Sequence, residues 1–394
     1  MLSVSDAIAQ LVAAAPRPPE SEPVPLCDAV GRVLAAPVES TIDVPPAANS
    51  AMDGYAIRAA DWTGPDSPMP VGARLAAGQA PGTHAPGTLT RIFTGAELPA
   101  GADAIVMQEN TRTDDHGTRV TKRPRTGDHV RPRGQDIGRG DRILDAGHRL
   151  RAQDIGLVAS VGIAEVPVHR RLRVAVVSNG DELVEPGRPT APGQIYNSNR
   201  YLLGSLLQGW GFEFVDAGIA ADRPDAIAAQ FSRAAESADV VLSCGGVSVG
   251  EEDHVKGVVE SLGRLDLWKI AMKPGKPLAF GVVGETPFIG LPGNPASALV
   301  TALIVARPFL LACQGAAATV PQPFAIPAAF RAPAGERQVY HRARRGAQGL
   351  ETYPNPSSGV LRSTAWAQGL AIQPPGKAIA PGDPVDFLPW SALS

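Results

Sequence analysis

The sequence has few cysteines, and their spacing gives them no evident structural role. Three occur in 394 residues, at Cys27, Cys244 and Cys313, and they form no CxxC pair. This spacing argues against a disulfide framework and against a structural zinc site. We therefore expect a protein of a reducing compartment, with a cytoplasmic location.

Long apolar runs and an excess of one charge are also lacking. The longest apolar run, 299–306, is far shorter than the roughly 20 residues of a membrane-spanning helix. The N-terminus has no basic segment before an apolar one, so we expect neither export nor a membrane anchor. With 36 basic and 39 acidic residues, the net charge is -3. Nothing in this balance favours nucleic acid as a partner, so any anion site must be local.

Glycine and proline, in contrast, are abundant. The chain has 42 glycines and 38 prolines, spread along its length and not gathered in a repeat. This distribution predicts many turns and short strands. The length predicts two to four domains, and 44% hydrophobic residues are enough for a sizeable core.

The first 170 residues change character twice. Apolar residues recur at helical spacing over 8–15 and again over 26–34, which predicts two amphipathic helices. Short strand-like runs between glycine, proline and aspartate turns then predict an inserted β domain. A helical pattern returns at 153–161, so we expect the flanks of the insertion to pack together. The strands predicted in the insertion are 55–58, 89–93, 104–107 and 119–121.

From residue 171 the pattern predicts an open α/β sheet. The continuous apolar run 172–177 is typical of a buried parallel strand, and strands and helices then alternate. The last 75 or so residues show short alternating runs that predict a small β-barrel or sandwich. The expected strands of the α/β sheet are 172–177, 212–217, 240–243, 268–271, 279–283 and 288–290, and its expected helices are 198–209, 224–236 and one from Pro295.

Four loops follow predicted strand ends and contain residues that suit an anion. Ligands of open parallel sheets bind at this edge, where backbone N–H groups are free. In the loop 243–253, glycines allow close backbone approach and serines add hydroxyl donors. Tight turns explain the glycines alone equally well. The candidate binding residues of this loop are Ser243, Gly245, Gly246, Ser248 and Gly250.

Lys273 and Lys276 favour a phosphate ligand. Two ammonium groups in the sequence KPGKP suit a multiply charged phosphate better than they suit an exposed basic turn. Acids in the neighbouring loops would repel a bare phosphate, and a bound Mg²⁺ would resolve that conflict. We expect Glu182 and Asp253 to be the metal ligands. The sequence therefore predicts a phosphate-bearing, anionic small molecule at this edge of the sheet.

Eight motifs occur together and in order. They are NSAMDGYA (49–56), RIFTGAELPAGADAIVMQE (91–109), RGQDI (133–137), SNGDEL (178–183), GQIYNSNR (193–200), CGGVSVGEEDHVK (244–256), AMKPGKPLAFG (271–281) and LPGNPASA (291–298). This set resembles the molybdopterin molybdenumtransferases, the MoeA family, to which the E domain of gephyrin also belongs. The likeness covers essentially the whole chain. It departs from the common pattern at Asn179, where threonine often precedes Gly-Asp-Glu.

The resemblance implies a multidomain fold and an activity. It implies an elongated homodimer of four-domain chains, with a MoaB/MogA-like open α/β domain, that converts adenylylated molybdopterin and molybdate into molybdenum cofactor and AMP with Mg²⁺. The active cleft would be shared between subunits, and whether a separate molybdopterin adenylyltransferase docks to deliver the substrate stays open. The expected domains are 1–41 with 143–170 (linker), 42–142 (inserted β domain), 171–318 (molybdopterin-binding α/β domain) and 319–394 (C-terminal β-barrel).

The resemblance also assigns functional residues by motif. It assigns catalytic roles to acids and a threonine in the inserted domain (Asp53, Thr94, Asp136) and to acids in the α/β domain (Glu182, Asp222, Asp253). It adds binding roles for the LPGNP turn and a C-terminal serine, which correspond to Pro292, Asn294, Pro295 and Ser358. The basic run 337–345 would help to hold a phosphate, although a solvated strand face explains it equally well.

Two other functions fit parts of the chain. A molybdopterin adenylyltransferase would share a domain like 171–312, but it would not need the inserted and C-terminal domains. A gephyrin-like scaffold is expected to be a longer chain with a fused N-terminal domain.

Overall fold

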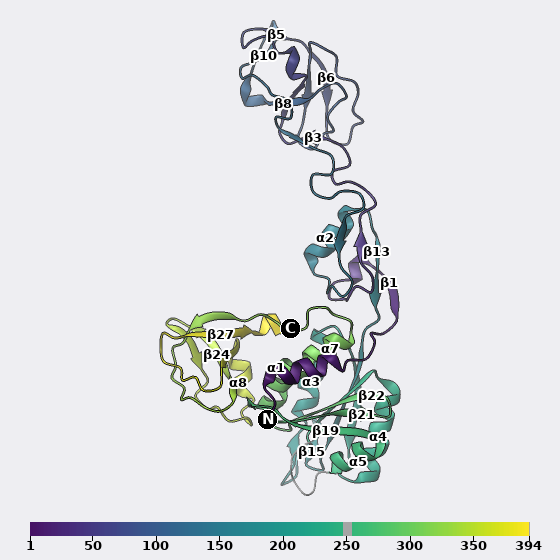
Figure 1. Ribbon diagram of the computed structural model, residues 1–394, viewed down its shortest axis with the longest axis vertical. Coiled ribbons are helices and arrows are strands. Elements are labelled where there is room, and N and C mark those ends of the chain that lie inside the picture. The colour runs from purple at the N-terminus through teal and green to yellow at the C-terminus, as the bar shows by residue number, and fades with distance from the viewer. Residues whose placement is uncertain (247–253, 394) are drawn as a thin grey trace. The chain divides into compact units, whose positions relative to one another are not determined.

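The computed structural model describes residues 1–246 and 254–393, and the chain divides into two compact units. One unit, here called the β unit, comprises 37–145 and 152–166. The other, the α/β unit, comprises 1–36, 146–151 and 167–394. It contains both the open sheet and the C-terminal sheet (Figure 1).

The β unit is built from short strands, as its turn-rich sequence predicts. Its main sheet has the order β6-β7-β4-β8, and a second sheet has the order β5-β10-β9. Ile57, Leu89 and Val106 form one core of the unit, and Ile92 and Ile105 belong to another. All four predicted strands are confirmed. The elements are β2 Val38–Glu39, β3 Asn49–Ser50, β4 Gly54–Ile57, β5 Pro68–Met69, β6 Val71–Leu75, β7 Leu89–Ile92, β8 Ala104–Met107, β9 Thr111–Asp114, β10 Gly117–Val120, β11 Val130–Arg131, β12 Arg142–Leu144 and helix α2 Ala152–Ser160.

The N-terminal segment forms one of the two helices predicted there. Helix α1, Val4–Ala13, is capped by Ser3, whose Oγ accepts a hydrogen bond from the Asp6 backbone N–H at 3.1 Å. The second predicted helix is wrong. The chain forms β1 Ser21–Pro25 and a 3-10 turn Leu26–Asp28, and Gly31 then takes a left-handed φ of 79°. The Gly31 N–H donates to the Leu150 carbonyl at 2.7 Å, so distant pairing replaces helical bonding here.

The α/β unit contains the predicted open sheet, with strand order β17-β14-β18-β22-β21-β19. The strands from β17 to β22 run parallel, and β21 and β19 add an antiparallel edge. The predicted strand 268–271 is displaced, since β19 already begins at Gly263. The elements are β13 Glu165–His169, β14 Arg173–Asn179, β15 Leu183–Val184, β16 Ile195–Tyr196, α3 Ser198–Gly209, β17 Glu213–Ala220, α4 Pro224–Ser237, β18 Val240–Cys244, α5 His254–Leu262, β19 Gly263–Lys269, β20 Met272–Lys273, β21 Pro277–Val283, β22 Thr286–Leu291 and a helix over 295–313.

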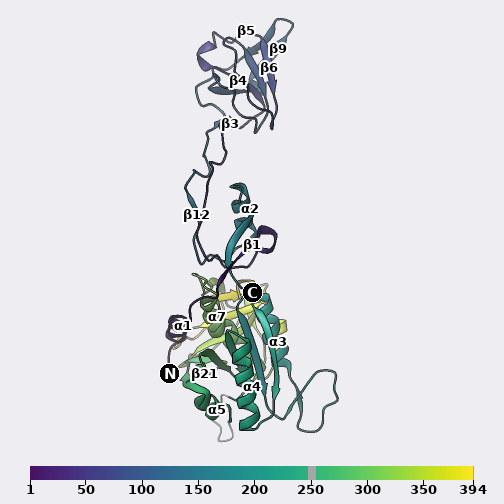
Figure 2. The same cartoon turned by 90° about the vertical axis from the view of Figure 1, so that its right-hand side faces the viewer.

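Helices cover both faces of this sheet (Figure 1 and Figure 2). Alternation along β14 sends Val174 and Val176 into a core with α1, α3 and the helix 295–313, whereas Ala175 and Val177 face α4 and α5. The helix 295–313 consists of α6 Pro295–Thr301, a π-helical turn Ala302–Ala306 and α7 Arg307–Cys313. It is long and apolar enough to cross a membrane, but 94% of it is buried inside the protein. It is therefore the core helix of this unit.

The C-terminal strands form an open sheet, and the predicted barrel is wrong. The order is β20-β24-β26-β27-β23, with β25 paired to β24. A barrel needs its two edges to pair along their length. In the described residues β25 is four residues long, and a single bridge, Ala328 to Leu350, joins it to the chain after β23. The elements are β23 Phe324–Pro327, β24 Gln338–Gly346, β25 Gly349–Thr352, α8 Arg362–Trp366, β26 Gly369–Gln373, β27 Pro384–Pro389 and α9 Trp390–Leu393.

Candidate functional site

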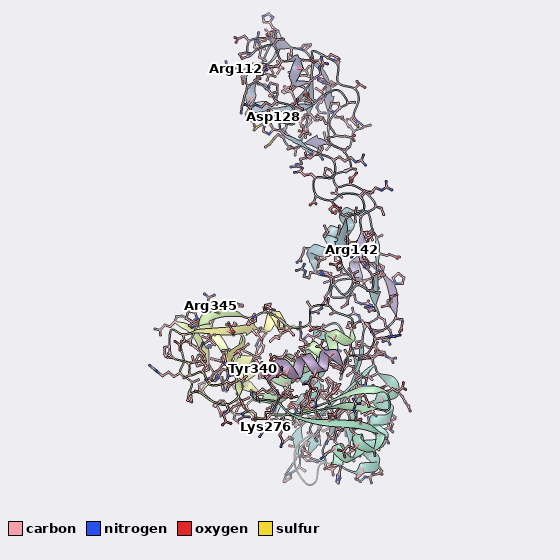
Figure 3. The ribbon with its side chains drawn as sticks, viewed as in Figure 1. Arg112, Asp128, Arg142, Lys276, Tyr340 and Arg345 are labelled. Carbon is pink, nitrogen blue, oxygen red and sulfur yellow. The ribbon has the colours of Figure 1, made fainter. Side chains whose placement is uncertain are left out.

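A cavity of about 1460 Å³ lies within the α/β unit. One wall is made by the loops at the carboxyl ends of β14, β18 and β22 and by the turn after β20. The other wall is made by β24 and by the segment 352–361 of the C-terminal part. Lys276 and Tyr340, labelled in Figure 3, belong to these two walls. The cavity therefore lies at the sheet edge at which the sequence places the ligand.

Glycines let the loop after β18 form the cavity wall. Gly245 and Gly246 both line the cavity and take left-handed φ angles of 93° and 69°. A Cβ on Gly246 would lie 2.3 Å from Cγ2 of Val255 in α5. The Gly245 N–H donates to the Leu291 carbonyl at 3.1 Å, which joins this loop to the end of β22. A side chain at Gly246 would therefore push the loop away from the helix behind it.

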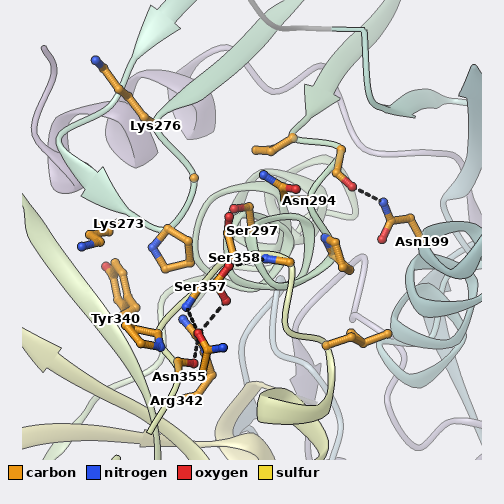
Figure 4. A pocket seen from close by; sticks show the side chains of 18 of the residues that line it. Asn199, Lys273, Lys276, Asn294, Ser297, Tyr340, Arg342, Asn355, Ser357 and Ser358 are labelled. Atoms are coloured by element: carbon orange, nitrogen blue, oxygen red, sulfur yellow. Dashed lines mark hydrogen bonds between the residues drawn. The ribbon is translucent and has the colours of Figure 1, made fainter. Parts of the chain in front are cut away.

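Lys273 and Lys276 line the cavity from the turn between β20 and β21 (Figure 4). Lys273 pairs with Val339 of β24, so this lysine is held by the C-terminal sheet. Gly275, between the lysines, has a φ of 103°, and a Cβ there would lie 2.3 Å from Oγ1 of Thr301. The turn thus packs its backbone against the core helix, and its two exposed lysines belong to the lining of the cavity.

The LPGNP turn, which joins β22 to α6, forms part of the cavity wall next to α3. Pro292, Asn294 and Pro295 all line the cavity. The turn is fixed by Asn199, whose Nδ2 donates to the Gly293 carbonyl at 2.7 Å (Figure 4). The thiol of Cys244 donates to the Pro292 carbonyl at 3.3 Å, and burial raises the pKa of this thiol to about 12. Sequence reasoning found the turn but missed the role of Asn199, which lies in the GQIYNSNR motif.

Arg342 of β24 is the buried cation of the site. Its side chain is 5% exposed, and it lines the cavity beside Ser357 and Ser358 (Figure 4). Its Nε donates to Ser363 Oγ at 3.0 Å and its Nη2 donates to the Ser357 carbonyl at 3.1 Å. Burial lowers the pKa of the guanidinium. Its hydrogen-bond partners among the described residues are neutral oxygens and include no carboxylate, so it has no fixed counter-charge there.

The sequence named Arg342 only as part of the basic run 337–345. Strand alternation does not separate it, because Arg342 and Arg344 lie two residues apart and therefore on the same face of β24. Arg342 is buried, whereas Arg344, nearer the end of the strand, is exposed. Arg344 pairs with Glu351 at 3.1 Å and stacks on the Trp366 ring at 4.5 Å. The run therefore divides into residues that face the cavity and residues that face solvent.

Positive charge dominates the lining of the cavity. The lining contains the cations Lys273, Lys276, Arg331, Arg337 and Arg342, whereas Glu182 is the acid among the described lining residues. An opposite charge in such a partly enclosed space is stabilised more than at an open surface. The cavity is thus suited to a multiply charged anion.

Glu182 is an exposed carboxylate on the cavity wall. A Cβ on Gly180 would lie 2.3 Å from its Oε2, so glycine at 180 leaves room for the carboxylate. The Asp222 N–H donates to Asp181 Oδ1 at 3.0 Å, but Asp222 is not part of the cavity lining. Ser248, Gly250 and Asp253 lie outside the described residues.

A preformed cluster for a metal ion does not occur in the part of the chain that the structure describes. Mg²⁺ usually binds through one or two carboxylates together with substrate phosphates, and it needs no all-protein cage. The exposed carboxylate of Glu182 beside a cationic cavity fits this mode of binding.

Ser243 is placed differently from its expected role. It is fully buried in β18 and does not line the cavity. Its hydroxyl has no hydrogen-bond partner among the described residues. Ser243 therefore lies behind the wall that Gly245 and Gly246 form.

The β unit brings Asp53 and Thr94 together. Asp53 follows β3, and Thr94 follows β7. Both the backbone N–H and the hydroxyl of Thr94 donate to Asp53 Oδ1, each at 2.8 Å. These two hydrogen bonds, the backbone one first, lower the pKa of the exposed Asp53 carboxyl. Asp136 is exposed as well, and its backbone N–H donates to the Val44 carbonyl at 2.9 Å.

An open α/β sheet with a cationic cavity at its carboxyl edge, a separate β unit and a C-terminal sheet define a multidomain protein whose cavity is suited to an anionic ligand. Three family descriptions match consecutive parts of the chain. They are "MoeA N-terminal region (domain I and II)" at residues 2–162, "Probable molybdopterin binding domain" at 175–312 and "MoeA C-terminal region (domain IV)" at 325–390.

Relatives match over most of their length. The molybdopterin molybdenumtransferase of Haemophilus influenzae is 40% identical over 80% of this chain and 78% of its own. That of Synechococcus elongatus is 36% identical over 98% of this chain and 99% of its own. The structure of the molybdopterin biosynthesis MoeA protein from Pyrococcus horikoshii superposes with a TM-score of 0.85 at 25% identity, covering 98% and 99% of the two chains. The chain belongs to the MoeA family of molybdopterin molybdenumtransferases.

Proposed function

We propose that this protein carries out the last step of molybdenum cofactor synthesis, in which adenylylated molybdopterin and molybdate give molybdenum cofactor and AMP. The observation that carries the proposal is the cavity, where Arg342 is buried without a carboxylate partner among the described residues and whose lining also contains Lys273 and Lys276. Its volume of about 1460 Å³ exceeds the 300–1,000 Å³ or so of ordinary ligand pockets. Such a space suits a large substrate that is bound together with a second anion.

The cations of the cavity would supply charge neutralisation. The substrate carries phosphates and molybdate is a dianion, so bringing them together costs repulsion that Lys273, Lys276 and Arg342 offset. Arg342 is already held by Ser363 and by the Ser357 carbonyl, so little reorganisation is needed when an anion binds. Positioning and neutralisation are the main contributions expected from such a site.

Mg²⁺ is part of the proposal. When bound, it would polarise the phosphate oxygens of the phosphoanhydride, the bond that breaks when AMP leaves. Glu182 on the cavity wall, with Asp253 of the following loop, would hold it. Asp222 next to this wall would act through its contact with Asp181.

The proposal also covers assembly and location. Asp53, Thr94 and Asp136 belong to the β unit, whereas the cavity belongs to the α/β unit. We propose a cytoplasmic homodimer in which the β unit of one subunit completes the cavity of the other. A molybdopterin adenylyltransferase is the enzyme class that must supply the substrate.

The comparisons favour this activity over an adenylyltransferase. The molybdopterin molybdenumtransferase of Synechococcus elongatus matches nearly from end to end, and the family descriptions include the β unit and the C-terminal sheet. A non-catalytic scaffold has no need of a cationic cavity of this volume.

Release of AMP from adenylylated molybdopterin, measured with and without molybdate and Mg²⁺, tests the proposal. Arg342→Ala should lower the molybdate-dependent rate about 10- to 100-fold, because a buried charged donor of the anion is lost. Arg344→Ala is the matched control, since Arg344 lies on the same strand but faces solvent. Wild-type protein that releases no AMP in response to molybdate would contradict the proposal.

A further inference from the structure

A row of side chains crosses one face of the main sheet in the β unit. Strand pairing aligns Arg74 of β6 with Arg91 of β7, and Arg91 with Tyr55 of β4. Residues aligned in this way lie on the same face of a sheet. Phe93, two residues beyond Arg91, extends the row toward Thr94.

The two arginines of this row stack on the aromatic rings. The Arg91 guanidinium lies 4.9 Å from the Phe93 ring centre and 5.1 Å from that of Tyr55. Arg74 lies 4.7 Å from the Phe93 ring centre. Stacking of this kind attracts the cation to the ring and restricts its orientation. Arg91 is therefore held in one place by two rings.

Arg91 also binds the turn that contains Asp53. Its Nη1 donates to the Gly54 carbonyl at 3.2 Å and its Nη2 donates to Gln108 Oε1 at 2.8 Å. The Gln108 backbone N–H donates in turn to the Asp53 carbonyl at 3.1 Å. A Cβ on Gly54 would lie 1.9 Å from the Val106 carbonyl oxygen, so this turn is pressed against β8. Arg91 links both carbonyl groups of the Asp53–Gly54 turn, one directly and one through Gln108.

These contacts use one of the two oxygens of the Asp53 carboxylate. Oδ1 accepts both hydrogen bonds from Thr94, and Oδ2 makes no hydrogen bond to the described residues. The charge of Arg91 adds to the two Thr94 hydrogen bonds in lowering the pKa of this carboxyl. The arrangement keeps an ionised oxygen available at a fixed position.

We propose that Arg91 is a positioning residue for the reaction: it holds the Asp53–Gly54 turn so that Asp53 meets both donors of Thr94 and presents Oδ2 to the reacting groups. This inference rests on the proposed function, since that function gives Asp53 its role. Arg91 acts through the turn and does not contact the substrate.

Steady-state kinetics of AMP release test this role. Arg91→Ala should lower kcat about 100-fold while KM changes less than about 3-fold, because the loss is one of alignment and not of substrate binding. Arg91→Lys keeps the charge but cannot make both hydrogen bonds of the guanidinium, so its kcat should be about 10-fold lower than that of the wild type. Arg74→Ala is the matched control. It removes the other cation stacked on Phe93 and should leave both constants within about 3-fold.

A second readout does not depend on activity. In full-length protein labelled with ¹³C-carboxyl aspartate, with the Asp53 signal assigned by its absence from Asp53→Asn, Arg91→Ala should move the Asp53 titration to higher pH. Arg74→Ala should move it less. If the wild-type protein releases no AMP, the proposed function fails, and this titration still decides the role of Arg91.

Three results would overturn the inference. One is a rise in KM at constant kcat for Arg91→Ala, which would place Arg91 on the substrate. Another is a fall in kcat for Arg74→Ala as large as that for Arg91→Ala, which would show that Arg91 acts only through the positive charge of this surface. The third is an unchanged Asp53 titration. Should Arg91→Ala unfold below the assay temperature, Arg91→Lys and Gln108→Ala carry the same test, with kcat lowered and the folded protein confirmed by its melting temperature.

Discussion

Arg342 shows how a single residue defines the chemistry of the cavity. A guanidinium that is 5% exposed would be costly to bury without acceptors, and two of its nitrogens donate to Ser363 and to the Ser357 carbonyl. Neutral oxygens satisfy its hydrogen bonds but leave its charge uncompensated. An anion entering the cavity therefore gains an interaction that the protein itself does not complete, and that difference favours binding of the anion.

The Asp53–Thr94 pair gives a prediction of pH dependence. A carboxyl whose pKa is lowered stays ionised down to lower pH, and its function is lost only as the pH falls through that lowered value. Thr94→Ala removes the hydroxyl donor and leaves the backbone donor, so the pKa of Asp53 should rise. The acid limb of the rate of AMP release should then move to higher pH, with a smaller change near neutrality.

Thr94→Ser is the control for this prediction, because serine retains a hydroxyl that can donate to Asp53. Its pH profile should follow that of the wild type. A profile of Thr94→Ala that is lowered equally at every pH would show that Thr94 does not act by keeping Asp53 ionised.

At the scale of elements, the pairing of β21 with the edge strand β19 leaves no room for a side chain at residue 281. β19 and β21 pair with Gly281 opposite Leu265, and a Cβ on Gly281 would lie 2.0 Å from the Arg264 carbonyl oxygen. Gly281→Ala should lower the free energy of unfolding by about 2 kcal/mol or more, because the strands must separate locally. Unfolding by denaturant measures it.

Gly257→Ala, in the helix α5 that covers one face of the same sheet, is the matched control. Gly257 is exposed in α5, and a Cβ there would have no atom within 4 Å. Alanine is the better helix former, so this change should raise the free energy of unfolding by up to about 1 kcal/mol. Equal effects of the two substitutions would contradict the contact between Gly281 and β19.

The elements that the sequence predicts well are those whose pattern is local. The buried run 172–177 and the helix 198–209 are found where expected, because continuous apolar residues and a capped amphipathic pattern specify them without reference to a partner. The helix expected at 26–34 fails because its apolar residues serve pairing with distant segments, as Val33 does with Arg149. Closure of the C-terminal sheet likewise depends on pairing between distant edges, which no local pattern encodes.

The same distinction applies to the candidate site. The glycine and lysine loops at the sheet edge were predictable, because strand ends in a parallel sheet converge on one edge. The burial of Arg342 was not, since it depends on how far along β24 the rest of the C-terminal part covers the strand. Nor was the burial of Ser243, which depends on where the strand ends and the loop begins. The residues brought to the site by the β unit came from motif resemblance.

The whole molecule gives the sharpest test of a shared site. If the β unit of one subunit completes the cavity of the other, a mixed dimer of Asp53→Ala and Lys276→Ala chains has one site with both residues intact. Refolding the two inactive variants together should restore about a quarter of the wild-type number of sites, measured as AMP release.

The comparison that decides this point is each variant refolded alone, which should stay inactive. A mixture that stays inactive, although the mixed dimer is shown by mass, would mean that Asp53 and Lys276 act within one chain. Recovery of activity would establish that each site combines the β unit of one subunit with the cavity of the other.

β20 belongs to the open α/β fold by its position in the chain and to the C-terminal sheet by its pairing with β24. Ala296, at the start of the core helix, is joined to the C-terminal part as well, since its N–H donates to the Ser358 carbonyl at 3.0 Å. The C-terminal part is therefore not an interchangeable module. Replacing it by an unrelated domain would remove the backbone partners of Lys273 in the cavity. We therefore expect the α/β sheet and the C-terminal part to be kept together in evolution.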